Sequence, residues 1–382
     1  MVFKTDKNFV TKVAIRGFSH RNFCANFARR AKPFLRFKTL VMWIAHWATQ
    51  IFVTYFQGKK LLQKERNYGL ALLKMFMAFE VVLCHCWNIA CGNLPIYQKI
   101  FAGLEGIAVP VFMFLSFYFL ERTFLNCTSE NIKKRLFRVS YPQFGWAFIY
   151  FFVYGSLKFL FNKFQTLKIS DLFLQILFGH TINTSMWFQF VLIVLTVIFF
   201  LVFYFWKEKN GILIIHILLL VSFLIQYTGL NSYAFSNLPS SLKYPLGRFF
   251  PMVPYAVIGF DFAYFSIFEK MKENRIYWLI LFFLSTIFLL KFKIINEAPG
   301  DGFYSSNNAI LTALCISGFA YLLPFEKINE KCLRLIEFIS KYTLGIYCMH
   351  RLVNKFACQI FVHMGFEESS FLGCILVYII CL

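Results

Sequence analysis

Three ionisable side chains interrupt one apolar run, Leu72–His85, and two of them align on a helix. Lys74 and His85 are eleven residues apart, and at about 100° per residue their side chains differ in direction by only about 20°. They are then separated by about 16 Å along the helix axis. Ionisable groups are costly in lipid, so an aligned cation and imidazole predict a functional polar path. The alternative is a lysine that extends to the membrane surface and a histidine satisfied by a neighbouring helix.

Two further segments hold residues that could do chemistry. Arg135 and Arg138 are three residues apart and would share a helix face, where two guanidiniums suit bidentate binding of phosphate or carboxylate. A plain orientation signal is the alternative explanation of this basic stretch. His350 is a second histidine within an apolar run, and Arg351 follows it. Two histidines inside apolar segments together with an arginine pair exceed what packing requires.

Composition places the chain among polytopic membrane proteins. Hydrophobic residues make up 59% of its 382 positions and charged residues 15%, whereas an average soluble chain is about 25% charged. The net charge of +21 is carried by short Lys and Arg clusters between apolar runs, which is typical of orientation signals and does not indicate nucleic-acid binding. The 11 cysteines show no CxxC spacing, so no metal site is predicted. No motif of soluble nucleotide enzymes is present.

Apolar runs and loops alternate from residue 68 onward. Nine runs are long enough to cross a bilayer, and a tenth begins at Phe371 and is short. The nine lie near 68–90, 100–120, 141–161, 187–206, 211–228, 248–268, 276–292, 307–324 and 343–362. The sequence therefore predicts an all-α polytopic membrane protein with about ten transmembrane helices. Its membrane domain is predicted to span 67–382.

The loops between these runs alternate in charge. Loops 57–66, 121–140, 207–210, 269–275 and 325–342 hold 4, 5, 2, 3 and 4 Lys and Arg. The intervening loops 91–99, 162–186, 229–247, 293–306 and 363–370 hold 1, 2, 1, 1 and 0. Because basic loops remain on the cytoplasmic side, the start of the first span and the C-terminus are predicted to be cytoplasmic. Lys74 then lies near the cytoplasmic surface, and His85 lies deeper.

Residues 1–66 are predicted to be a basic N-terminal extension. The first 39 residues contain ten Lys and Arg and one acid. This composition is compatible with a transit peptide or with a cytosolic segment that lies on anionic lipid. It is also compatible with a predicted translation start that lies too far upstream. Residues 40–56 are apolar, but they are few, contain His46 and Gln50, and have basic clusters on both sides. We interpret 40–56 as an interfacial amphipathic helix rather than a span.

Taken in chain order, five segments resemble those of the acyltransferase-3 family of membrane acyltransferases. Lys74 with His85 resembles the family's Arg/Lys-x10-His motif, and Leu344–His350 resembles its GIYLxH motif. The other similar segments are Val109–Tyr118 in the second span, Arg135-x-x-Arg138 with Tyr141-Pro142, and Met186–Phe188. The resemblance covers roughly 68–382 and includes the ten-span count. The chain departs from the family pattern at two positions, since Phe117 replaces the usual glycine and Lys74 stands where many members have arginine. The phenylalanine is expected to reduce close helix packing, and the lysine keeps the charge but loses the bidentate fork.

The resemblance implies an enzyme that transfers an acyl group, usually acetyl, from acyl-CoA to a hydroxyl of a surface or exported glycan. It also implies a bacterial plasma (inner) membrane location. On this basis Arg135 and Arg138 hold the CoA phosphates and Lys74 guides the donor. His85 deprotonates the acceptor hydroxyl, and His350 orients the acceptor or polarises the thioester carbonyl.

The expected partners follow from the same resemblance. Acyl-CoA, above all acetyl-CoA, is the donor substrate, a glycan or lipid-linked saccharide is the acceptor, and membrane lipids surround the chain. Neither a metal nor a nucleic acid is expected. Two alternatives stay open: a transporter or flippase of a glycan or lipid-linked intermediate, and an inactive relative. No inverted halves typical of many transporters are visible, while Phe117 and the short last span are the reasons to consider an inactive relative.

Ser129 offers a test of the predicted orientation, because its loop holds five basic residues and the loop after the third span holds two. In a background without competing cysteines, Ser129→Cys should react with an impermeant thiol reagent only from the cytoplasmic side. The measurement is labelling of intact cells against labelling of opened membranes. Reaction in intact cells would overturn the whole alternation.

Overall fold

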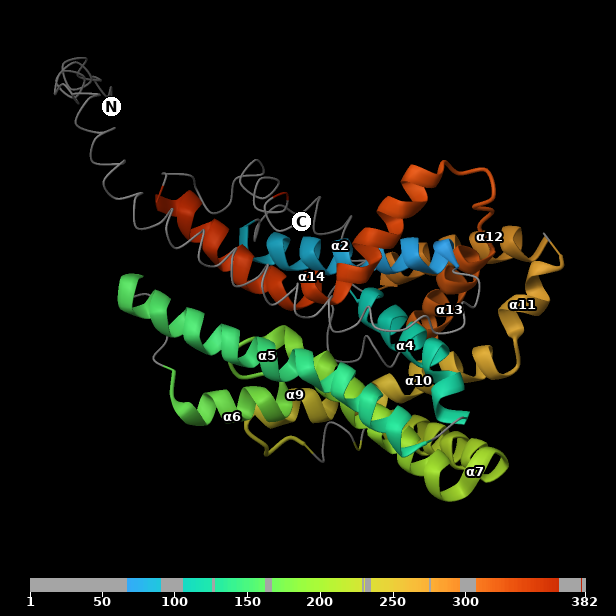
Figure 1. Ribbon diagram of the computed structural model, residues 1–382, viewed down its shortest axis with the longest axis horizontal. Helices are drawn as coiled ribbons and strands as arrows, with labels where there is room; N and C mark the ends of the chain where they lie inside the picture. Colours follow the sequence, from blue (N-terminus) through green and yellow to red (C-terminus); the bar gives the residue numbers. More distant parts are fainter. Residues whose placement is uncertain are drawn as a thin grey trace, which may run out of the picture. The chain divides into compact units, whose positions relative to one another are not determined.

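The computed structural model describes residues 67–90, 106–125, 128–161, 167–228, 230, 235–274, 276–295, 307–363 and 379. Every regular element in these residues is a helix (Figure 1), which confirms the predicted all-α class. The basic extension 1–66 with its segment 40–56 lies outside the described residues. The same holds for the predicted last span from Phe371, apart from position 379.

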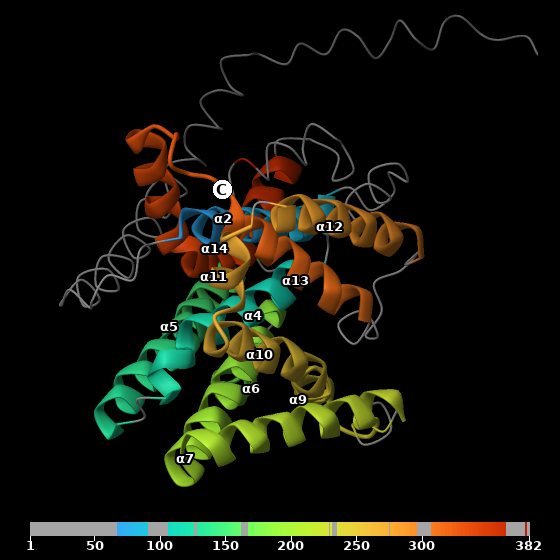
Figure 2. The ribbon, with the colours of Figure 1, turned by 90° about the vertical axis from the view of Figure 1, so that its right-hand side faces the viewer.

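The long helices follow the predicted apolar runs, and short helices are added in the connections. The elements are α2 (Tyr68–Ala90), α4 (Ala108–Leu125), α5 (Ser129–Phe161), α6 (Ile169–Phe178), the 3-10 helix η1 (Thr184–Met186), α7 (Trp187–Tyr227), α9 (Ser240–Gly247), α10 (Phe249–Tyr264), α11 (Ile267–Lys272), α12 (Ile276–Ile295), α13 (Asn307–Leu322) and α14 (Glu330–His363). Among them, α12 and α13 pack side by side (Figure 2).

Two helices begin earlier than the predicted spans. The helix α5 begins at Ser129 rather than near 141, so the stretch with Arg135 and Arg138 is helical and not a loop. The helix α14 begins at Glu330 rather than near 343. In both cases the added turns are rich in Lys, Arg and Glu, which are good helix formers. The apolar stretch thus predicted where a span lies but not where its helix begins.

The helix α7 contains two predicted spans in one run of 41 helical residues. A straight helix of that length would measure about 61 Å, twice the hydrocarbon thickness. A Cβ atom added to Gly211 would lie 2.9 Å from the ring of Phe203, although eight residues separate them by about 12 Å along a straight helix. The chain therefore folds back on itself at the predicted loop 207–210, and the missing side chain of Gly211 makes room for the ring.

Two segments of the described chain are long and apolar enough to cross a membrane by length and composition. They are Thr184–Trp206 and Glu208–Tyr227, the two arms of α7. Shorter apolar helices lie at Ala108–Glu121, Ile169–Phe178, Ile276–Phe288 and Asn308–Leu322. These helices agree with a membrane protein. The count of ten spans and their orientation stay predictions.

The helices α2 and α14 pack against one another and run in the same direction (Figure 1). Asn67 caps the start of α2, because its Oδ1 accepts from the Leu70 backbone N–H at 2.9 Å. Its Nδ2 also donates to the carbonyl of Tyr321 at the end of α13, at 2.9 Å. The ring of Tyr68 lies 6.4 Å from that of Phe325, in the connection to α14. The start of α2 is thus anchored beside the chain that leads into α14.

The helix α4 packs closely against α10 and at a greater separation against α7. A Cβ atom added to Gly259 of α10 would lie 2.3 Å from the carbonyl oxygen of Phe114, so α10 lies directly on the α4 backbone. Phe117 is fully buried, and its ring centroid lies 4.6 Å from that of Phe199 in α7. A pair of rings therefore separates α4 from α7, where a glycine would permit the backbones to approach.

Candidate active site

The two histidines predicted from the sequence lie against each other. His85 projects from α2 and His350 from α14, and their rings stack with centroids 4.9 Å apart and an interplanar angle of 16°. His350 is fully buried. Its Nδ1 lies 2.6 Å from the carbonyl oxygen of Tyr347, and since a carbonyl only accepts, Nδ1 carries the proton. In a neutral ring the Nε2 atom of His350 is then an acceptor, and it is buried without a hydrogen-bond partner among the described residues.

Ser185 joins His85 to an arginine. Its Oγ lies 3.4 Å from Nε2 of His85 and accepts a hydrogen bond from Nε of Arg351 at 2.7 Å. Because the guanidinium can only donate, the Ser185 hydroxyl proton is available to Nε2 of His85. A neutral imidazole, a buried hydroxyl and a guanidinium thus form one short chain of polar groups at the contact between α2, η1 and α14.

The loop that carries Ser185 is fixed by a buried glutamine. Oε1 of Gln175 in α6 accepts from three consecutive backbone N–H groups, at 2.8, 2.6 and 3.1 Å. These belong to Thr181, Ile182 and Asn183. Gly179 has a φ of +69°, and a Cβ there would lie 2.4 Å from the Met186 carbonyl oxygen, so this turn requires glycine.

Backbone contacts of Ser185 complete its placement. Its N–H donates to Oδ1 of Asn183 at 3.0 Å, and its carbonyl accepts from the Tyr347 hydroxyl. Tyr347 is the residue whose own carbonyl faces His350. The position of Ser185 is therefore set from α6 and from α14 at once.

A tyrosine is inserted into α14 where the site residues lie. The hydroxyl of Tyr150, from α5, donates to the carbonyl of Cys348 at 2.8 Å and accepts from the N–H of Leu352 at 3.1 Å. These two backbone groups would pair directly in a regular helix, and such insertions bend helices. The insertion spans the residues between them, which include His350 and Arg351. Asn354 then ties α14 to α2, because its Nδ2 donates to the His85 carbonyl at 2.9 Å.

The other predicted site residues lie away from the histidines. Lys74 projects from α2 three turns before His85, and its Nζ lies 5.3 Å from the centroid of the Phe119 ring. Arg135 and Arg138 are neighbours on the first part of α5, as their spacing predicted. Nε of Arg135 is buried without a hydrogen-bond partner. Burial, together with the charge of Arg138, lowers the pKa of Arg135 to about 10, so it stays cationic at neutral pH.

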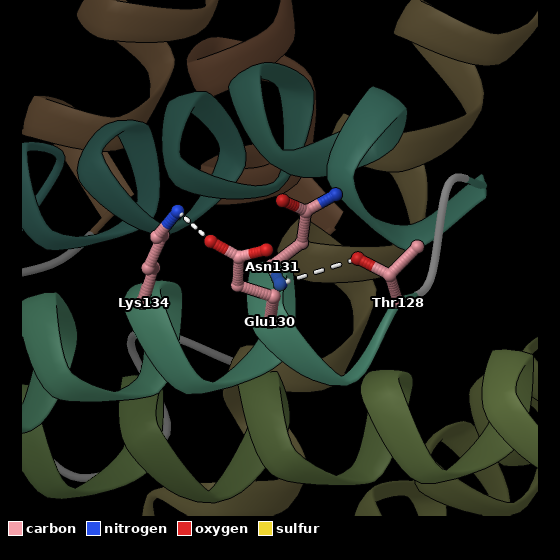
Figure 3. A network of polar contacts seen from close by, with 4 residues as sticks. All are labelled: Thr128, Glu130, Asn131 and Lys134. Carbon is pink, nitrogen blue, oxygen red and sulfur yellow. Dashed lines mark hydrogen bonds and ion pairs between the residues drawn. The ribbon is translucent and has the colours of Figure 1, made fainter. Parts of the chain in front are cut away.

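A local network fixes the start of α5 that carries this arginine pair (Figure 3). Thr128 is the cap, since its Oγ1 accepts from the N–H of Asn131 at 3.3 Å. Lys134 forms an ion pair with Glu130 one turn earlier. The charge of Lys134 is thereby balanced within the helix.

Sequence reasoning found both histidines but missed the residues that join them. Tyr347 and Arg351 stand beside His350 in the segment that was singled out. Ser185, Tyr150 and Asn354 gave no signal, because an isolated polar residue in or beside an apolar run is usually a structural helix contact. Only their contacts across α5, η1 and α14 show that they belong to the site.

One comparison with known proteins gave a match. Residues 67–382 match the model of a family described as an acyltransferase domain. The match includes every residue of the site described above. No curated protein and no solved structure matches the chain.

Tyr150→Phe tests the inserted hydroxyl. The substitution removes both hydrogen bonds of the hydroxyl to α14, so the free energy of unfolding should fall by about 1–3 kcal/mol. The measurement is the thermal unfolding midpoint of purified protein in detergent. Tyr204→Phe is the matched control, because Tyr204 is 57% exposed. Equal midpoints for the two variants would contradict a structural role of the Tyr150 hydroxyl.

Proposed function

Because the chain belongs to the acyltransferase-3 family, we propose that it is an integral-membrane enzyme that transfers an acyl group, above all acetyl, from cytosolic acyl-CoA to a hydroxyl of a surface or exported glycan. The observation that carries this proposal is the contact of the His85 imidazole with the Ser185 hydroxyl and, through it, with Arg351. It brings an imidazole, a hydroxyl and a cation together in one place. The family match favours this enzyme over a transporter that uses the same residues.

His85 is the general base in this proposal. Neutral imidazole accepts the proton of the acceptor hydroxyl, whose oxygen attacks the thioester carbonyl. The carbon–sulfur bond then breaks, and the thiolate of CoA takes the proton from His85. Arg351, which lies beside Ser185, adds a positive charge next to the reacting groups.

His350 then has one of its two predicted roles. A neutral ring with its proton on Nδ1 cannot donate through Nε2, so it is not suited to polarise a carbonyl. Its Nε2 can accept a hydrogen bond from a hydroxyl. We assign His350 to orienting the acceptor.

The donor phosphates bind to the cations away from the histidines. Arg135 and Arg138 supply paired guanidiniums on α5, and Lys74 supplies a further cation on α2. The pantetheine arm of CoA is long and flexible, so its phosphates and its thioester can occupy separate positions. Acyl-CoA is cytosolic, and these residues belong to the end of the helices predicted to face the cytoplasm. The proposed location is the bacterial plasma membrane.

His85 is tested by a pair of substitutions. His85→Gln keeps polarity and approximate size but cannot take a proton near neutral pH, so turnover should fall by about 10²–10⁴-fold. His85→Ala should lower turnover similarly, with the donor affinity nearly unchanged for both variants. The measurement is transfer of labelled acetyl from acetyl-CoA, normalised to folded protein. A glutamine variant with near-normal turnover would remove His85 from the chemistry and leave His350 as the candidate base.

The arginine pair is tested through donor binding. Replacement of both Arg135 and Arg138 by glutamine removes two charge-assisted contacts to phosphate, each worth about 1.5–3 kcal/mol, so acetyl-CoA should bind at least about tenfold more weakly. The measurement is equilibrium binding of labelled acetyl-CoA to purified protein. Lys134→Gln is the control, since Lys134 is already paired with Glu130. Unchanged affinity in the double variant would move the CoA site elsewhere.

A further inference from the structure

Two cations on the second half of α14 lie near the histidines and have no carboxylate partner among the residues that the structure describes. Arg351 and Lys355 are one helical turn apart, so their side chains are neighbours on one face. Nζ of Lys355 lies 4.6 Å from the centroid of the Tyr154 ring in α5. Within the described chain, no ion pair includes either residue. The electrostatic neighbours of Arg351 are the hydroxyls of tyrosines, and that of Lys355 is Arg351 itself.

The first half of α14 shows the usual arrangement for comparison. Arg334 pairs with Glu330 at 2.9 Å and Lys341 with Glu337 at 3.0 Å, in each case one turn earlier on the same helix. The residues one turn before Arg351 and Lys355 are Tyr347 and Arg351. Half-buried cations that lack a counter-ion are unfavourable, because they lose hydration without gaining an ion pair. A ligand that brings an anionic group would supply the missing charge.

The geometry of Arg351 suits such a group. Its Nε is used by Ser185, while its Nη nitrogens make no hydrogen bond in the described part of the chain. These nitrogens form the fork that recognises phosphate and carboxylate oxygens. Lys355 adds a second cation about 6 Å away along the helix axis. One anionic group can therefore contact both residues.

This cation pair lies on the opposite side of the histidines from Lys74. The helices α2 and α14 run in the same direction and meet where His85 stacks on His350. Lys74 stands about 16 Å before that level on α2, and Lys355 stands about 7 Å beyond it on α14. A donor whose phosphates bind at Lys74 leaves the Lys355 side to the acceptor.

A neighbouring cluster adds positive charge near Arg351. The Arg248 guanidinium lies 4.0 Å from the ring centroid of Tyr244 and 4.7 Å from that of Trp187. The His180 ring stacks on the Tyr244 ring, and their centroids are 4.2 Å apart. Burial and the charges of Arg248 and Arg351 lower the pKa of His180 to about 4, so His180 is neutral at neutral pH. Arg248 and Arg351 therefore both place positive charge near His180.

We propose that the acceptor carries an anionic group, a phosphate or a carboxylate, which Arg351 and Lys355 bind while its hydroxyl lies at His85. The inference rests on the proposed function and names the class of acceptor at that same site. The anionic group takes no part in the bond changes. The acyl carbon leaves the sulfur of CoA for the hydroxyl oxygen, and the hydroxyl proton passes through His85 to the thiolate.

The charge of the product is the direct test. Membranes of the cells that naturally make the chain are supplied with labelled acetyl-CoA, and membranes with the His85→Ala variant give the background. The labelled product is extracted and applied to an anion-exchange resin at neutral pH. Retention supports the proposal, and a product that passes through unretained overturns it. If no product depends on the chain, the proposed function itself fails.

Two chemical treatments of the labelled product then identify the source of its negative charge. Mild acid, which cleaves sugar–diphosphate–lipid linkages, should abolish retention if the charge belongs to a lipid-linked phosphate. Reduction of carbodiimide-activated carboxyl groups should abolish it if the charge belongs to an acidic sugar. Loss of retention after either treatment supports the proposal and selects the source.

A substitution separates acceptor binding from donor binding. With purified protein and the extracted acceptor fraction, Lys355→Gln should raise KM for the acceptor by about tenfold or more, the effect of losing one charge-assisted contact. Its kcat and its KM for acetyl-CoA should change by less than about threefold, and Lys355→Arg should keep the wild-type KM. Lys341→Gln, a cation paired on the same helix, is the matched control. A raised KM for acetyl-CoA instead would assign Lys355 to the donor and overturn the proposal.

Discussion

The contact between α2 and α14 determines the site, because each helix brings polar groups that the apolar interior cannot hydrate. His85 and His350 stack on each other, and the side chain of Asn354 takes up the carbonyl of His85. Ser185 and Arg351 extend this contact sideways. A polar group buried in such an interior is costly unless another protein group pairs with it. The polar groups of α2, η1 and α14 therefore hold one another in place.

The helix α14 has two different halves. In its first half the cations are balanced by carboxylates one turn earlier. In its second half, Arg351 and Lys355 have no such partner among the described residues, and a tyrosine hydroxyl from α5 bonds to both Cys348 and Leu352. The same few residues thus combine an irregular helix, a buried histidine and an unbalanced charge. Such features are unfavourable for stability alone and are typical of functional sites.

Charge divides the proposed substrates between two sides of the histidines. Lys74 lies on one side along α2, and Arg351 with Lys355 lies at and beyond the other side along α14. A donor with several phosphates and an acceptor with one anionic group would otherwise compete for the same cations. Separation along parallel helices avoids this competition, and it leaves the neutral imidazoles between the two charged regions.

The sequence by itself predicted the helical class, the membrane character and two histidines inside apolar runs as candidate site residues. Apolar runs with a charged or imidazole side chain are recognisable because the cost of burying such groups is local to the run. It also predicted that Arg135 and Arg138 share a helix face, since that depends only on helix geometry. The fold-back at Gly211 was predicted from four polar residues between two spans, although the chain there is helical throughout.

Only the tertiary structure decided which polar residues meet. Ser185 is 100 positions and Asn354 is 269 positions from His85. A neutral polar side chain such as theirs or that of Tyr150 carries no periodic signal in the sequence. Their partners are fixed by how α2, α5, η1 and α14 pack, which depends on shape complementarity over whole helices. The starts of α5 and α14 were missed for a related reason, since charged turns outside the apolar core are stable as helix or as loop. The hydrophobic pattern of the sequence indicates which segments are buried. Which residues contact one another is decided by how the helices pack.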